Sequence, residues 1–242
     1  MIFASSASKT LGIGLLAIAA LAMGATAAAV EWPSFAGAPE RLPRDVAQRI
    51  ERVWRAPTLT RTIHGRAALV PLETYVVFID AADVTTAAAR FLGIGRQEVR
   101  ALDDDVYEAD DHAGATGRYR VLVREPRRRV ILSWGEHRGR LFGTIRGSTL
   151  SVVDFERGKG RVEQRLTAYV LIENRIAARL LKLLAPIVGG LADRKLAESF
   201  NVVVGVAEWA VGHPDEFCRW MARAALAAAR RDRVLDRLSM CR

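Results

Sequence analysis

The chain has 242 residues, half of them hydrophobic, which is enough for one ordinary domain with extensions to bury a real core. Its formal net charge is +9, and nearly all of its basic residues are arginine. These charges are scattered along the chain instead of forming a patch with interleaved aromatic residues, which argues against nucleic acid as a partner. A basic surface of this kind still favours anionic lipid headgroups.

The first 29 residues have the pattern of an export signal. Lys9 is the only charge before an uncharged run over residues 11–30. Small residues end the run, and Ala25-Thr26-Ala27 and Ala27-Ala28-Ala29 are both acceptable cleavage sites. The competing interpretation is an uncleaved membrane anchor, since the run is about long enough to cross a bilayer. Either way we expect the folded part outside the cytoplasm, in a periplasmic or other extracytoplasmic space.

Residues 30–60 are predicted to form a linker and a short helix. The linker is rich in proline, glycine and alanine, and the helix follows over about residues 44–54, with Val46, Ile50 and Val53 on one side. A first strand is predicted over residues 61–69. The next segment, residues 71–80, is ambiguous between helix and strand because it holds a short apolar run of β-favouring residues.

A helix over residues 81–92 comes next, with Val84 and Phe91 on its apolar face. The chain then changes to the alternation of a half-buried antiparallel sheet, for example where Tyr119, Val121 and Val123 alternate with arginines. The glycines at 158 and 160 favour a tight hairpin turn. The predicted strands cover residues 98–108, 117–125, 129–134, 139–146, 147–155 and 161–172.

From Arg175 to about Ala210 the apolar residues have helical spacing, and the pair Gly189-Gly190 inside this stretch is either a kink or a break between helices. A last helix is predicted over residues 214–238. Its side with Phe217, Met221 and Leu226 either lies on an anionic membrane or packs on its own domain.

The order of these elements resembles the helix-grip fold of the START-like (SRPBCC) superfamily. The resemblance is carried by the opening strand 62–69 with Pro71 after it, the hairpin 147–172 and the helix from Arg175, and it covers residues 61–210. It implies an α+β fold in which a curved antiparallel sheet wraps a long C-terminal helix. Residues 211–242 form an additional helical extension, which departs from the family pattern, as does the glycine pair in the gripping helix.

The resemblance also implies a cavity between sheet and helix that holds a hydrophobic ligand, such as a lipid. The alternatives are an interaction module with a solid core, and a cyclase-type enzyme that uses the same cavity. The cavity candidates are apolar or aromatic, and each is also compatible with plain core packing. They are Phe78, Phe91, Tyr119, Trp134, Phe142, Tyr169, Leu183, Ile187 and Phe200.

No catalytic residue, metal site or cofactor is predicted. There is no G-x-S-x-G motif, and Ser133, Ser148 and Ser151 fall within predicted strands. The four histidines, His64, His112, His137 and His213, lack the spacing of metal ligands.

An acidic cluster lies between residues 103 and 111. It lacks the D-x-D-x-D-G loop of a calcium site, so we interpret it as a solvated turn. The two cysteines, Cys218 and Cys241, either form a disulfide or remain separate thiols; the sequence leaves both open.

Overall fold

The computed structural model describes residues 31–139 and 143–241. Side chains are outside the description at positions 175, 180–196, 199 and 239. The chain divides into two compact units, Met1–Glu31 and Trp32–Arg242. The predicted export signal therefore lies outside the described residues, and the second unit holds the fold. In the described part of the chain, no helix combines the length and apolar character needed to cross a membrane.

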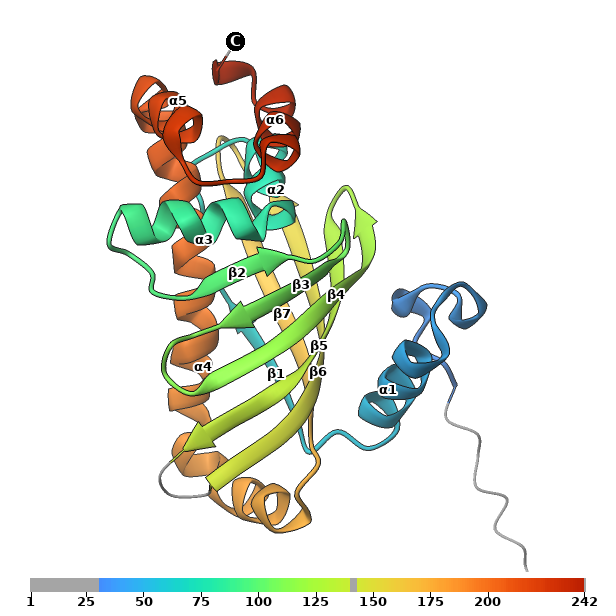
Figure 1. Ribbon diagram of the computed structural model, residues 1–242. Helices are drawn as coiled ribbons and strands as arrows, with labels where there is room; N and C mark the ends of the chain where they lie inside the picture. The colour runs from blue at the N-terminus through green and yellow to red at the C-terminus, as the bar shows by residue number, and fades with distance from the viewer. Residues whose placement is uncertain (1–30, 140–142, 242) are drawn as a thin grey trace, which may run out of the picture. The chain divides into compact units, whose positions relative to one another are not determined.

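Seven strands form one antiparallel sheet in the order β1-β7-β6-β5-β4-β3-β2. The first strand of the chain thus pairs with the last, which leaves β1 and β2 at the two edges. The sheet bends around helix α4, as Figure 1 shows. The strands are β1 (Leu59–His64), β2 (Glu98–Ala101), β3 (Val106–Asp110), β4 (Ala115–Glu125), β5 (Arg128–Gly139), β6 (Gly143–Arg157) and β7 (Val162–Ile172).

Helix α4 is assigned as one helix through Gly189-Gly190. Figure 1 shows its first turns at a steep angle to the rest, and the longer part that follows lies along the inner face of the sheet. The other helices after α1 gather near the C-terminal end of α4 (Figure 1). The helices are α1 (Arg44–Arg55), α2 (Leu72–Asp80), α3 (Ala82–Phe91), α4 (Arg175–Gly212), α5 (Pro214–Arg223) and α6 (Ala228–Arg237), with short 3₁₀ turns at Ser34–Ala36, Pro39–Arg41 and Ser239–Cys241.

The inner face of the sheet and the helices share one hydrophobic core. Strands β6 and β7 place alternate residues such as Phe155 and Leu166 in it, as period-2 side-chain alternation requires. Helix α5 contributes Phe217 and Met221, both fully buried. Of the two alternatives for this C-terminal helix, Phe217 and Met221 therefore follow the second, in which the apolar side packs on its own domain.

A second, smaller core covers the outer face of the sheet. Helix α1 buries Val46, Ile50 and Val53, the three residues that predicted this helix from their spacing. They pack against outer-face residues of β5 and β6, which include Leu132 and Leu150. Helix α1 is thus held to the sheet by a continuous apolar stripe.

Strand β4 does not keep its predicted alternation along its whole length. The register with β5 shifts between Val121 and Val123, so the strand carries a β-bulge there. Tyr119 and Val121 face the inner side, whereas Val123 packs in the outer core. One extra residue reverses the side to which every later side chain points.

A row of glycines crosses the middle of the sheet. Gly117, Gly135 and Gly147 are direct partners across β4, β5 and β6. A Cβ atom on Gly117 would lie 2.6 Å from the carbonyl oxygen of Trp134, which no side chain tolerates. The row therefore permits close strand approach and leaves a band of the inner face without side chains.

Several predicted strand boundaries are wrong. The first strand, predicted over residues 61–69, is β1 (Leu59–His64), and the strand predicted over residues 129–134 continues to Gly139 as β5. Residues 98–108 form two strands, because the three aspartates 103–105 turn the chain and Asp103 accepts a hydrogen bond from the backbone N–H of Asp104. Residues 143–146 and 147–155 belong to one long strand, β6, since Gly147 lies within the ladder and does not end it; Gly139 is the last residue of β5. The ambiguous segment 71–80 is helical, as α2.

The predicted last helix is also divided, into α5 and α6. No proline or glycine occurs at the break, residues 224–227. The tertiary contacts explain it: the chain turns back so that Cys241 forms a disulfide with Cys218, with the two Cα atoms 5.6 Å apart. The same turn lets Arg230 of α6 reach Asp83 of α3.

Candidate functional site

A cavity of about 380 Å³ lies between the inner face of the sheet, helices α2 and α3, and the second half of α4. Its size falls within the range of small-molecule sites in proteins. Most of the side chains that enclose it are apolar. The described lining residues are Phe78, Ile79, Asp80, Ala82, Thr85, Thr86, Gln97, Val99, Tyr107, Tyr119, Val121, Arg129, Ile131, Ser133, Ser151, Val153, Leu166, Phe200, Val202 and Val203.

Several polar groups in the lining already have partners. The hydroxyl of Thr85 donates to the carbonyl of Phe78 at 2.6 Å, and that of Thr86 donates to the carbonyl of Ala82 at 2.8 Å. Both threonines thus bond within the α2–α3 segment and present methyl groups to the surroundings. They add little polarity to the cavity.

Three hydroxyl groups differ from these threonines. Tyr119 and Ser133 are direct cross-strand partners on the inner face, and Ser151 lies on the neighbouring strand β6. None of these hydroxyls has a hydrogen-bond partner among the described residues. Burial raises the pKa of Tyr119 well above its ordinary value, so its hydroxyl stays protonated and can donate. These three residues, called the polar station below, each add a hydroxyl to the lining of a mainly apolar cavity.

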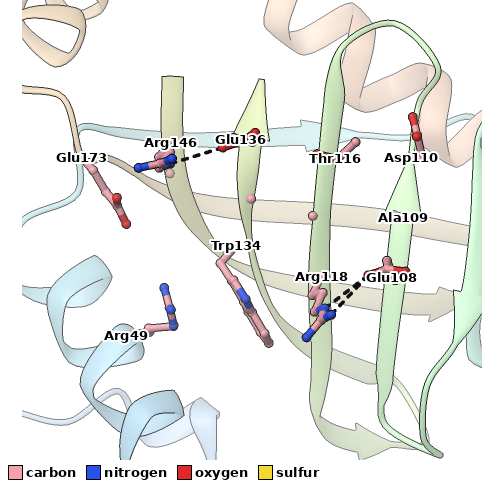
Figure 2. A pocket seen from close by; sticks show the side chains of 13 residues that line it. Arg49, Glu108, Ala109, Asp110, Thr116, Arg118, Trp134, Glu136, Arg146 and Glu173 are labelled. Atoms are coloured by element: carbon pink, nitrogen blue, oxygen red, sulfur yellow. Dashed lines mark hydrogen bonds and ion pairs between the residues drawn. The ribbon is translucent and has the colours of Figure 1, made fainter. Parts of the chain in front are cut away.

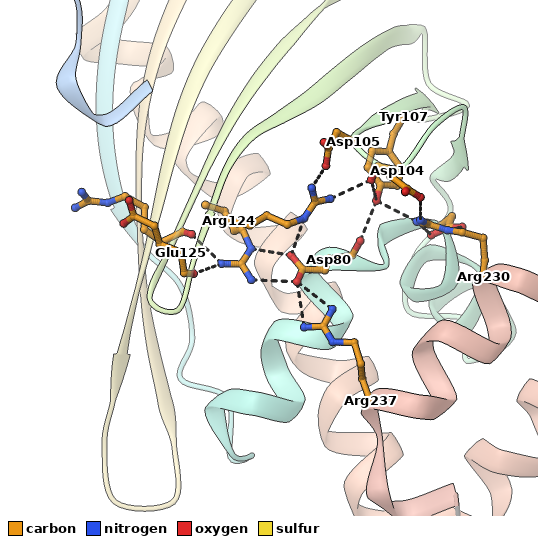
Figure 3. A network of polar contacts seen from close by, with 11 residues as sticks. Asp80, Asp104, Asp105, Tyr107, Arg124, Glu125, Arg230 and Arg237 are labelled. Carbon is orange, nitrogen blue, oxygen red and sulfur yellow. Dashed lines mark hydrogen bonds and ion pairs between the residues drawn. The ribbon is translucent and has the colours of Figure 1, made fainter. Parts of the chain in front are cut away.

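A buried ion pair forms one wall of the cavity (Figure 3). Arg129 is only 4% exposed, and its Nε and Nη2 lie 2.7 and 3.0 Å from the two carboxylate oxygens of Asp80. Its Nη1 donates to the backbone carbonyls of Arg128 and Glu125. With its donors directed to these acceptors, Arg129 holds the wall and is not free to bind a ligand anion.

Helix α6 supports the same wall from outside. Arg237 donates to Asp80 at 3.2 and 3.3 Å, and Arg230 donates to both carboxylate oxygens of Asp83 and to the Tyr107 hydroxyl. The hydrogen bond from Arg230 to Asp83 raises the pKa of Arg230, so the guanidinium stays charged. Tyr107 in turn stacks on Tyr119, with ring centroids 4.8 Å apart. These contacts connect the C-terminal helix to the polar station.

A second hollow, of about 360 Å³, adjoins the cavity along the glycine row. Both hollows are lined by Tyr119 and Ser133. The second extends past Gly135 to His137 and Ile145 of β5 and β6. The polar station therefore lies where the two hollows meet.

Another hollow, of about 650 Å³, lies on the opposite face of the sheet (Figure 2). There Arg49 of α1 lies over the ring of Trp134, 5.5 Å from its centroid. Charges of both signs line it and pair with one another, as Arg118 does with Glu108 at 3.4 Å. Its lining is charged, so the mainly apolar cavity on the inner face is the better ligand site despite its smaller volume.

Three of the nine cavity candidates, Phe78, Tyr119 and Phe200, line the cavity. Trp134 and Tyr169 lie on the outer face, because each alternates with an inner-facing neighbour in its strand. Phe91 is 55% exposed at the end of α3 and does not line the cavity. Phe142 lies outside the described residues, as do the side chains of Leu183 and Ile187.

The sequence analysis did not predict that the serine hydroxyls line the cavity or that Asp80 and Arg129 form an ion pair in its wall. Ser133 and Ser151 were considered only as nucleophiles, although a serine at an inward position of an apolar strand is itself a sign of a polar contact in a cavity. Asp80 and Arg129 lie far apart in the sequence, and nothing local connects them. The histidines and cysteines form no cluster that could hold a metal ion within the described chain.

The acidic cluster between residues 103 and 111 is largely ion-paired. Asp104 pairs with Arg233 of α6, and Asp105 pairs with Arg124. The hydrogen bond from Arg233 lowers the pKa of Asp104. Asp104 therefore helps to attach helix α6, whereas Asp105 pairs with strand β4; the sequence interpretation as a solvated turn included neither role.

No protein-family model matches the chain, and no curated protein matches it. Among solved structures, a conserved protein from Geobacillus kaustophilus is similar over 62% of this chain and 93% of its own, with 14% identity and a TM-score of 0.43. For Ara h 8.0201 the coverage is 64% and 100%, the identity 8% and the TM-score 0.41. For the di-domain ARO/CYC BexL from the BE-7585A biosynthetic pathway the coverage is 68% and 56%, the identity 14% and the TM-score 0.35.

At these TM-scores and identities, the fold has to be judged from the strands and helices of this chain. Strands β2 to β7 follow one another in a single curved sheet, with β1 added beside β7, and the longer part of a 38-residue helix near the C-terminus lies along the concave face. The chain therefore has the predicted α+β fold, a curved antiparallel sheet wrapped on a long C-terminal helix, in the helix-grip arrangement.

Proposed function

We propose that this protein binds one hydrophobic molecule, such as a lipid, in the cavity between sheet and helix and carries it outside the cytoplasm. The observation that supports this most strongly is the mainly apolar cavity of about 380 Å³ between sheet and helix. Burial of apolar ligand surface is favourable by about 25 cal/mol for each Å² removed from water. A solid-core interaction module, the first alternative, would not need such a cavity.

The polar station limits the chemistry of the guest. Tyr119 stays protonated and is a hydrogen-bond donor, with Ser133 opposite it and Ser151 on the next strand. A guest with one carbonyl, ester, hydroxyl or carboxyl group among apolar atoms would satisfy these groups. We therefore expect an amphiphile and not a pure hydrocarbon.

Export is part of the proposal. The first 29 residues have the charge and hydropathy pattern of a signal segment, and Cys218 and Cys241 form a disulfide. Disulfides persist mainly in oxidising compartments such as the periplasm. Both features support an extracytoplasmic location for the carrier.

A cyclase-type enzyme remains the second candidate, because Tyr119 could polarise a carbonyl group of a guest. A general base is harder to find. Asp80 lines the cavity, but both of its carboxylate oxygens accept hydrogen bonds from guanidinium groups. A cyclase would lose turnover in Tyr119→Phe, whereas a carrier would only bind a polar guest about two- to tenfold more weakly, the loss expected for one hydrogen bond.

The test of binding is native mass spectrometry followed by organic extraction. The protein is purified from residue 30 onward, which keeps the whole compact unit Trp32–Arg242. A carrier shows a mass increment that disappears on extraction, and the extract contains an amphiphile. A bare protein mass, unchanged after incubation with phospholipid and fatty acid, would count against the proposal.

The variant Ser151→Phe should exclude the guest, because the new phenyl ring takes up the space inside the cavity. The new ring projects into the void from β6, so guest occupancy should fall by about tenfold or more while the free energy of unfolding changes by about 1 kcal/mol or less. The matched control, Thr60→Phe, places the same ring at an exposed position of edge strand β1. If both variants retain the guest equally, the cavity is not the binding site.

A further inference from the structure

We propose that residues 90–96, the loop from α3 to β2, dock the protein onto an anionic lipid bilayer. The sequence of this loop, Arg-Phe-Leu-Gly-Ile-Gly-Arg, places apolar residues between two arginines. The choice of a membrane as the partner rests partly on the proposed carrier function, but docking itself is tested separately. Residues 90–96, which are the end of α3 and most of the loop to β2, are called the docking loop.

The docking loop exposes large apolar side chains that the fold could have buried. Phe91 is 55% exposed and Ile94 is 46% exposed. Behind Phe91 lie two half-buried tryptophans, Trp209 of α4 and Trp220 of α5, with ring centroids 5.8 and 6.0 Å from its own. Aromatic side chains of this kind are favoured at the boundary between lipid and water.

The charges at both ends of the docking loop match an anionic surface. Arg90 and Arg96 are exposed, and neither pairs with a carboxylate of the described residues; Arg90 donates only to the backbone carbonyl of Gln97, at 2.8 Å. By contrast, the exposed Arg100 of the next strand pairs with Glu108. Two guanidinium groups without a carboxylate partner, beside exposed apolar side chains, fit phosphate headgroups above acyl chains.

The docking loop also borders the cavity. Ile94 packs over Gly205 of α4, where an added Cβ would lie 2.8 Å from its terminal methyl group. Gly95 lies against Val202, which lines the cavity together with Gln97 at the end of the loop. Figure 1 shows the loop between α3 and β2, beside the C-terminal half of α4. A guest that passes under this loop would move between bilayer and cavity without crossing water.

The experiment measures sedimentation of the protein from residue 30 onward with vesicles. The wild type should bind vesicles of equal phosphatidylglycerol and phosphatidylcholine, bind pure phosphatidylcholine weakly, and dissociate as salt is raised. Arg90→Gln with Arg96→Gln should weaken the partition about thirty-fold, which corresponds to ~1 kcal/mol for each arginine near an anionic surface. Phe91→Ser with Ile94→Ser should weaken it about tenfold or more.

Matched controls come from the same chain. Leu69→Ser removes another exposed apolar side chain, 67% exposed, and Arg44→Gln with Arg52→Gln removes two exposed charges from α1. These variants should bind like the wild type. Equal loss in the controls, equal binding to both vesicle types, or a dimer that depends on Phe91 without vesicle binding would each overturn the proposal.

The guest content of the docking variants separates the two proposals. Native mass spectrometry should find their cavity guest unchanged, since none of the four substituted side chains lines the cavity. An empty wild-type cavity with intact vesicle binding would remove the carrier function and leave the docking loop. A loaded wild-type cavity without vesicle binding would remove the docking proposal and leave the carrier function.

Discussion

Replacement of Asp80 by asparagine should lower the free energy of unfolding by about 3 to 5 kcal/mol. The reason is the buried guanidinium of Arg129, which would lose the carboxylate that lies 2.7 and 3.0 Å from its nitrogens. Arg237 of α6 would lose its partner as well. Urea denaturation followed by tryptophan fluorescence measures the change.

Two further variants test whether the buried ion pair is the origin of this loss of stability. Glu51→Gln breaks the exposed pair with Arg55 on α1 and should cost about 0.5 kcal/mol or less, because solvent screens such pairs. Asp80→Asn combined with Arg129→Met should recover about half of the loss, since the unpaired buried charge is gone. If the double variant is less stable than Asp80→Asn alone, the ion pair is not the origin of the effect.

Removal of the disulfide, by Cys218→Ser with Cys241→Ser, should lower the free energy of unfolding by about 3 kcal/mol. The bond closes a loop between residues 23 apart in the sequence, and loss of loop-closure entropy in the unfolded chain gives a value of this size. Within the folded protein, helix α6 should open first. Its amide hydrogens should then exchange faster, whereas those of β5 and β6 should not change.

Reduction supplies the control for this second prediction. Dithiothreitol should destabilise the wild type by a similar amount and leave the serine variant unaffected. A serine variant as stable as the oxidised wild type would show that the contacts of α6 with Asp80, Asp83 and Asp104 hold the C-terminus by themselves.

The central strands were predictable because one face of each is buried against a core. Where a strand has that contrast, as in β7, alternation fixes its existence and shows which of its residues share a face. The prediction failed where one local residue changes the geometry. The bulge after Val121 reverses Val123, and Gly147 looked like a strand end although it lies in the middle of β6.

The candidate site was only partly predictable, for a different reason. Alternation shows which residues share a face, and it correctly groups Tyr119 with the inner side. It does not show which of the two faces meets the helix, so Trp134 was assigned to the cavity although it lies outside. The wall made by Asp80 and Arg129 depends on the turn of the chain through α2, which no periodicity records.

The glycine row has a consequence for how the guest specificity of this fold can change. At Gly117, Gly135 and Gly147 every possible substitution adds atoms to the inner face, so mutation can shorten the adjoining hollow but cannot lengthen it. The same atoms would push neighbouring strands apart and flatten the bend of the sheet. Guest length and sheet curvature are therefore not independent traits in this protein, and the present sequence already gives the greatest length that these three positions allow.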